Sequence, residues 1–201
     1  MKRETAEKFN ILIGTSVTNI YFSETRGLIS CDNMFGFNFK SREKELSLHV
    51  FSFLRVRDDK NLYLTTKDEF VDKNYRHLTK SPASWLAGTL MKKRMKSVRN
   101  LLKKQVVTAV HLLDCGDLFI QFSNGMFLEV FVNYSCEDYE YYRLMDLKSD
   151  VHIVVSYTNG GLCIQDPDGV VFEQYEPVGF VKQLSILQNF IKPKGDRNSF
   201  R

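Results

Sequence analysis

The sequence predicts an α+β fold in which two β-meander halves, a possible internal repeat, are joined by a basic amphipathic helix and followed by a C-terminal helix. Three observations predict it: apolar–polar alternation interrupted by turn residues, a central stretch with a helical apolar period, and a partial self-similarity between the halves. The 201 residues, 43% of them hydrophobic, are enough for a single compact domain over 1–201.

The first half, residues 8–72, is expected to form a β-meander. Alternating apolar residues predict strands near 10–22, 28–39, 46–57 and 61–66. Turn-like segments at 23–27 and 57–61 separate some of these strands.

A helix is expected over residues 81–104, between the two halves. Ser81 is a suitable N-cap, and Pro82 suits the first helical position because proline lacks the N–H that would be unpaired there. An apolar stripe at helical spacing follows, formed by Ala87, Met91, Met95, Val98 and Leu102.

The second half, residues 105–176, is expected to be a longer meander, and a helix over 178–191 should follow it and end before Pro193. The strands are expected near 106–113, 117–123, 126–132, 140–146, 150–158, 161–165 and 169–175.

Two hairpin registers fit the stretch DLFIQFSNGMFLEVF at 117–131. A two-residue Asn-Gly turn would pair Phe122 with Phe127 and place Glu129 among apolar side chains. A three-residue Ser-Asn-Gly loop with a left-handed Gly125 is preferred, because it gathers the apolar side chains on one face. That face would hold Leu118, Ile120, Phe122, Met126, Leu128 and Val130.

The internal similarity has a spacing of about 90 residues. Residues 17–22 resemble 107–112, and residues 48–53 resemble 151–157. Because the spacing differs between these matches, we expect an edited repeat. Chance alternation in two β-rich segments is the alternative.

Charge is arranged in blocks along the chain. Residues 1–72 carry 11 basic and 11 acidic side chains, 73–113 carry 10 and none, 114–180 carry 2 and 12, and 181–201 carry 5 and 1. The net charge of +4 therefore hides a cationic middle and an anionic second half. Either these two blocks face each other, or each one faces a partner of opposite charge.

The basic helix is a candidate nucleic-acid-binding surface, since its cations could follow a phosphate backbone. A solvated helix face is the simpler interpretation, because no stacking aromatic residue is interleaved with the cations. The candidate residues are Lys92, Lys93, Arg94, Lys96, Arg99, Lys103 and Lys104.

The acidic, tyrosine-rich stretch NYSCEDYEYY at 133–142 is a candidate protein-binding surface. Tyrosines offer rigid contact area, and carboxylates attract a basic partner. An acidic loop with inward-facing tyrosines is the alternative. The candidate residues are Tyr134, Glu137, Asp138, Tyr139, Glu140, Tyr141 and Tyr142.

No catalytic motif is found, so we expect no enzyme activity, no metal and no cofactor. The cysteines and histidines are scattered, without a C-x-x-C or H-E-x-x-H pattern. His49 and His152 could be partners across a cleft, although hydrogen-bonded strand histidines are the simpler interpretation. Asp166, Asp168 and Glu173 could indicate calcium, but Asp-Pro-Asp-Gly is typical of a tight turn.

The start of the chain, MKRETAEKFN, is polar and precedes no apolar run of the kind found in signal peptides. No stretch approaches the roughly 18 uncharged apolar residues that span a bilayer. We therefore expect a cytoplasmic protein with free thiols and no membrane partner.

The second half resembles a pattern found in small β-rich bacterial proteins, some of which are similar to immunity proteins of polymorphic toxin systems. The resemblance lies mostly in residues 105–157 and assigns no functional residues. It is carried by Val107, Val110, Leu112, Asp117, Leu118, Ile120, Phe122, Asn124, Gly125, Leu128, Glu129, Val130 and Tyr142-Arg143-Leu144.

The resemblance implies a cytosolic inhibitor that neutralises a basic, toxin-like protein by stoichiometric occlusion. A protein-binding module of this kind is our first expectation. The alternative is a nucleic-acid-binding or anti-phage accessory protein that uses residues 92–104.

Overall fold

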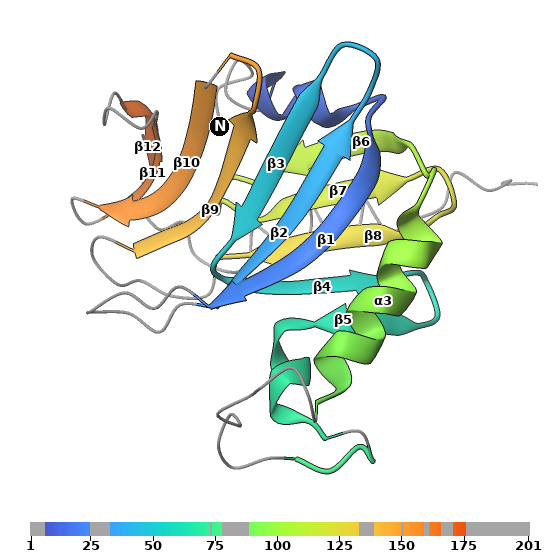
Figure 1. Ribbon diagram of the computed structural model, residues 1–201. Helices are drawn as coiled ribbons and strands as arrows, with labels where there is room; N and C mark the ends of the chain where they lie inside the picture. Colours follow the sequence, from blue (N-terminus) through green and yellow to red (C-terminus); the bar gives the residue numbers. More distant parts are fainter. Residues whose placement is uncertain are drawn as a thin grey trace, which may run out of the picture.

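The protein is mainly β, with two antiparallel sheets and one longer helix, α3, in the described part of the chain (Figure 1). The computed structural model describes residues 7–24, 33–72, 74–77, 89–132, 139–149, 151–158, 161–165 and 171–175. The predicted C-terminal helix at 178–191 lies outside these residues. The strand content makes "mainly β" a better description than α+β.

The larger sheet has seven strands in the order β1-β2-β3-β9-β10-β11-β12. Its strands are β1 (Ser16–Glu24), β2 (Asn33–Lys40), β3 (Glu45–Val50), β9 (Tyr139–Asp146), β10 (Val151–Thr158), β11 (Gly161–Gln165) and β12 (Val171–Tyr175).

The smaller sheet has five strands in the order β5-β4-β8-β7-β6. Its strands are β4 (Phe53–Arg57), β5 (Leu62–Thr65), β6 (Val107–Leu112), β7 (Leu118–Phe122) and β8 (Phe127–Phe131). Each sheet therefore contains strands from both halves of the sequence.

The strand predicted over 46–57 is divided between the two sheets, as β3 and β4. The chain crosses at Phe51 and Ser52, whose amides both donate to the carbonyl of Tyr141, at 2.8 and 3.1 Å. Since the chain stays extended on both sides of the crossing, the apolar alternation alone did not show the break.

The preferred hairpin register is confirmed. The Phe122 amide donates to the Met126 carbonyl at 2.9 Å, which closes a three-residue loop, and Gly125 has φ +79°. Leu118 pairs with Val130 and Ile120 with Leu128. All six apolar side chains assigned to the inner face are buried.

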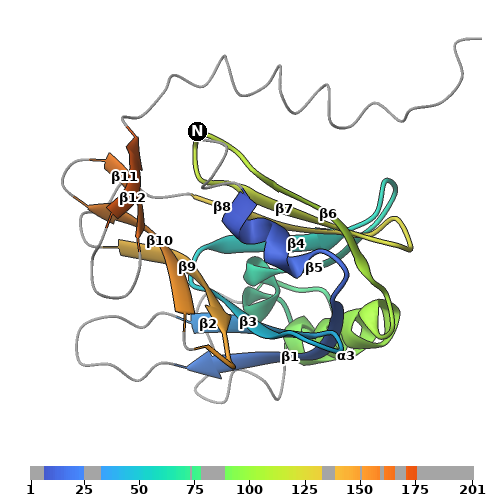
Figure 2. The same ribbon diagram turned by 90° about the horizontal axis from the view of Figure 1, so that it is seen from above.

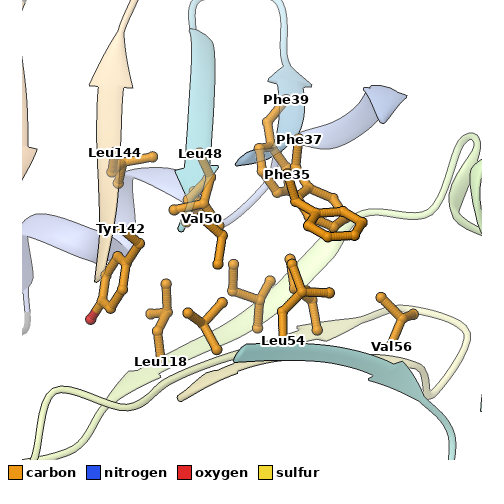
Figure 3. Close-up of a cluster of buried hydrophobic side chains, with 14 of the residues drawn as sticks. Phe35, Phe37, Phe39, Leu48, Val50, Leu54, Val56, Leu118, Tyr142 and Leu144 are labelled. Carbon is orange, nitrogen blue, oxygen red and sulfur yellow. The ribbon is translucent and has the colours of Figure 1, made fainter. Parts of the chain in front are cut away.

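The core lies between the two sheets, which form two layers in Figure 2. Figure 3 shows Phe35, Phe37 and Phe39 of β2 above Leu54 and Val56 of β4. Each of these five side chains is at most 1% exposed. Burying a side chain of this size stabilises the fold by about 1.5–3 kcal/mol.

The N-terminal segment covers one opening between the sheets and ends in a short 3-10 helix, η1 (Asn10–Leu12). Phe9 and Leu12 are fully buried, and the ring of Phe9 meets that of Tyr142 edge-on with centroids 6.1 Å apart. The prediction that the first strand begins near residue 10 was therefore wrong, because residues 10–12 form η1 and the strand begins at Ser16.

Helix α3 (Leu90–Leu102) packs against the edge strands β1 and β5, one from each sheet. Met91, Met95, Val98 and Leu102 are buried, so the described part of the predicted apolar stripe is confirmed. A continuous helix over 81–104 was wrong, because Thr89 is extended and pairs with Asp72. The expected cap residues Ser81 and Pro82, and Ala87, lie outside the described residues.

The expected repeat is not confirmed. Residues 17–22 lie in β1 and residues 107–112 form β6, but residues 48–53 run from β3 into β4 whereas 151–157 lie within β10. The segments 48–53 and 151–157 therefore occupy different positions in the strand order. Among the described helices, none is long and apolar enough to cross a membrane.

Candidate functional site

The described part of the tyrosine-rich segment belongs to the fold. Tyr141 and Tyr142 are fully buried, and the Tyr142 hydroxyl donates to the carbonyl of Gly116 at 2.6 Å. Val155 pairs with Tyr142 and Ser156 with Glu140, which leaves Tyr141 as an extra residue in a β-bulge. Both tyrosines are therefore closed to a partner, which corrects their assignment to a binding surface.

The remaining described residues of this segment already have partners. The Tyr139 hydroxyl donates to the carbonyl of Phe51 at 3.0 Å. Arg143 donates to both carboxylate oxygens of Glu140, from Nε at 3.0 Å and from Nη2 at 2.6 Å. Tyr134, Glu137 and Asp138 lie outside the described residues, so their role in partner binding remains a prediction.

A polar row crosses the outer face of the seven-stranded sheet, from Tyr21 over Gly36 to His49 and Arg143. The Tyr21 ring lies so close over Gly36 that an added Cβ would come within 2.1 Å of its Cζ atom. The Tyr21 hydroxyl lies 2.7 Å from His49 Nε2. Burial and then the charge of Arg143 lower the pKa of His49.

His49 and His152 do not face each other across a cleft. They lie in β3 and β10 of the same sheet, with β9 between them. Among the described residues, no group of three or more His, Cys, Asp or Glu side chains is arranged to hold a metal ion. Asp166 and Asp168 lie outside the described residues.

Sequence reasoning missed an ion-pair cluster on the outer face of the five-stranded sheet. Glu129, with a side chain 1% exposed, accepts hydrogen bonds from Arg55 and from Arg57 Nε, the latter at 2.8 Å. The guanidinium of Arg57 lies 4.9 Å from the ring centroid of Phe127, and that of Arg55 lies 5.1 Å from the centroid of Phe131. These cation–π contacts cover the phenylalanine rings that the hairpin turns outward.

Two of the predicted nucleic-acid-binding residues attach α3 to neighbouring elements. Arg94 Nη1 donates to Asp68 Oδ1 at 2.7 Å, and Arg99 Nη2 donates to the carbonyl of Ile20. Asp68 belongs to η2 (Thr66–Phe70), which follows β5, and Ile20 belongs to β1. Arg94 is half-buried in its ion pair and is therefore committed to the fold, which corrects its assignment to a binding face. Arg99 is exposed, so its role in nucleic-acid binding remains a prediction.

The other five cations are exposed, and none forms an ion pair with a described residue. Three lie on α3 and two in the turn that follows it. We call this set the lysine surface, and it consists of Lys92, Lys93, Lys96, Lys103 and Lys104.

The ion pairs of the described residues do not join the basic block to the acidic block. Arg94 pairs with Asp68 and Arg76 with Asp72, both acids from the first 72 residues. On the acidic side, Glu129 pairs with Arg55 and Arg57, and Glu140 with Arg143. The charge of the lysine surface is thus not neutralised by these pairs.

The first turn of α3 opposes its own helix dipole. Thr89 is the N-cap but forms no side-chain capping bond, and the first turn has no acidic residue. Lys92 and Lys93 stand there instead, near the positive end of the dipole, where a cation costs about 0.3–1 kcal/mol. Helix stability therefore does not explain these two lysines.

Lys104 also has a conformation that its residue type disfavours. It has φ +70°, and the Gln105 amide donates to the Leu102 carbonyl at 2.9 Å. With Lys103 at φ −58° and ψ 125°, this is a type II turn, in which the Lys104 position favours glycine.

Comparison of the chain with protein-family models, curated proteins and solved structures returned no match.

Proposed function

We propose that this protein binds nucleic acid through the phosphates and that the lysine surface is its main contact. The observation that carries the proposal is the exposure of five lysines, none paired with a described acid, on and after a helix that packs against an edge strand of each sheet. A rigid row of cations lowers the entropic cost of following a regular polyanion.

The length of the lysine surface fits several phosphates. Lys92, Lys96 and Lys103 stand at helical spacings of four and seven residues, on one side of the buried stripe. At about 1.5 Å of rise per residue, they span about 16 Å. Phosphates of one strand in a duplex are about 3.4 Å apart along the axis, so the row covers roughly five of them.

The proposal predicts salt-dependent binding of labelled oligonucleotides. For five phosphate contacts, log K against log salt should have a slope of about −3.5 with single strands and about −4.5 with duplex DNA. Replacing Lys92, Lys93 and Lys96 with glutamine should weaken binding and make the slope shallower by about 2 to 3. Fluorescence anisotropy across a salt series measures both quantities.

The matched control replaces Lys40, Lys60 and Lys148 with glutamine, which removes the same charge from turns and strand ends outside the lysine surface. This control should keep the slope of the unmodified protein. An equal loss in both triple variants would mean that only net charge matters, and it would overturn the assignment to the lysine surface.

A second candidate is the inhibitor function, in which the anionic half neutralises a basic, toxin-like protein. It is favoured by the absence, among the described residues, of ion pairs between the acidic and basic blocks. Its recognition residues would be Tyr134, Glu137 and Asp138. Both candidates place the protein in the cytoplasm. A partner retained at equal stoichiometry after nuclease treatment would favour this second function.

The strand order also supports the internal repeat as a proposal. β4 leaves the meander β1–β3 to pair with β8, and β9 leaves the meander β6–β8 to pair with β3. Each half thus contributes three strands to one sheet and its next strand to the other, as expected for a duplicated unit.

A further inference from the structure

An exposed aromatic residue stands beside the start of α3. Tyr75 is 67% exposed, the highest value among the large hydrophobic side chains of the described residues. Its φ of 64° places it in the left-handed region, which a bulky side chain seldom occupies. Such conformations persist where the surrounding structure fixes them, and they are concentrated at functional sites.

A hydrogen-bonded turn fixes this conformation. Asp72 Oδ1 accepts from the amides of Asn74 and Arg76, both at 2.8 Å. The Tyr75 amide donates to the Asp72 carbonyl at 3.0 Å, and the Asp72 amide donates to the Arg76 carbonyl at 2.9 Å. The aromatic ring is therefore presented by a braced loop.

The same turn is attached to the first residues of α3 (Figure 1). Asp72 pairs with Thr89, the N-cap, and the Leu90 amide donates to the Val71 carbonyl at 2.8 Å. Lys92 and Lys93 follow within the first helical turn. The backbone thus places an exposed tyrosine next to the beginning of the lysine surface.

Tyr75 and Lys104 are the non-glycine residues with positive φ in the described part of the chain. One precedes α3 and the other follows it, so the two strained positions bracket the lysine surface. Neither conformation is required by a buried side chain, because both residues are exposed.

We propose that the nucleic acid bound by this protein is single-stranded and that one of its bases stacks on Tyr75. This inference rests on the proposed function and specifies its ligand. A ring beside a row of cations fits a strand whose bases are free, because the phosphates pair with the lysines while a base covers the ring. In a duplex the base faces are already stacked, so the tyrosine adds nothing there.

The test compares oligonucleotides of equal charge with and without bases. The probes are a labelled 12-mer of deoxythymidine, an abasic 12-mer with the same phosphates, and a 12-base-pair duplex. The unmodified protein should bind the thymidine strand about 5- to 100-fold more tightly than the abasic strand. Tyr75→Gly should abolish that preference and leave the affinity for the abasic strand unchanged.

Glycine is the informative substitution because it accepts positive φ, so Tyr75→Gly should keep or raise the melting temperature. Tyr75→Trp should retain the preference for bases. Leu147→Ala, which shortens a side chain 51% exposed in the turn after β9, is the matched control.

The outcomes separate the two proposals. If the unmodified protein binds thymidine and abasic strands equally, or if Tyr75→Gly keeps the preference, the stacking role of Tyr75 is wrong while the lysine surface can still stand. If none of the probes binds in a salt-dependent way, the proposed function itself fails, and the stacking inference fails with it.

Discussion

At the scale of single residues, the lysines in the first turn of α3 are the clearest departure from what the fold requires. Thr89 is the N-cap, and Lys92 occupies the third helical position, where a glutamate would return a hydrogen bond to the cap and complement the dipole. A residue that lowers stability where a better one is available is typical of a site selected for binding.

Lys92→Glu should therefore move stability and binding in opposite directions. The new capping box and the removed cation should raise the free energy of unfolding by about 1 kcal/mol. The same change should weaken nucleic-acid binding, since it replaces a phosphate contact with a like charge. Urea denaturation and anisotropy measure the two effects, and a loss of stability would show that Lys92 has a structural role instead.

At the scale of elements, α3 depends on two arginines that flank its buried stripe. Arg99 attaches the helix to the seven-stranded sheet, and Arg94 attaches it to η2 beside the five-stranded sheet. Asp68 also completes a capping box for η2, because its Oδ2 accepts from the Thr65 amide at 3.0 Å. One carboxylate thus fixes the start of η2 and the position of α3.

Arg94→Ala should destabilise the protein by about 3 kcal/mol, because it leaves the buried Asp68 carboxylate without its cation. Asp68→Ala alone should also be destabilising. In a double-mutant cycle, the two substitutions together should cost less than their sum. Strict additivity in urea denaturation would show that this ion pair does not hold α3.

At the scale of the whole molecule, burial makes stability depend on pH. Desolvation lowers the pKa of His49 in the larger sheet and of His111 in the smaller one from the ordinary value of 6.5. Burial raises the pKa of Asp68 and Asp117 above 3.8. As pH falls, the unfolded chain thus protonates these histidines first, whereas the folded protein protonates these carboxyl groups first.

The free energy of unfolding should therefore fall as the pH is lowered through and below 6.5, because the unfolded state then binds more protons. Closer to pH 4 the raised pKa values of Asp68 and Asp117 act in the opposite direction. Hydrogen bonds lower the pKa of Asp58 and Asp146, and these two groups extend the decline. His49→Gln with His111→Gln should remove the decline near pH 6, and the exposed His77→Gln is the control. An unchanged profile in the double variant would assign the decline to other groups.

Turn residues and apolar periodicity predicted those parts of the fold that depend on interactions between residues close in sequence. The Ser-Asn-Gly loop set the hairpin register, and the apolar period gave the buried stripe of α3. The bulge at Tyr141 and the crossing at Phe51 depend on pairing with strands distant in sequence, so no local pattern marked them. Tyr75 was missed because apolar and charge patterns do not register φ, although Asp72 and Asn74 are typical turn residues.

The exchange of β4 and β9 between the sheets has a consequence for synthesis on the ribosome. When the first 72 residues have emerged, β3 and β4 have been made, but their neighbours β9 and β8 have not. Both strands then present unpaired edges, which attract other extended chains. The nascent chain is therefore open to aggregation until residue 146 has left the exit tunnel, and during that interval a holdase chaperone has most to protect.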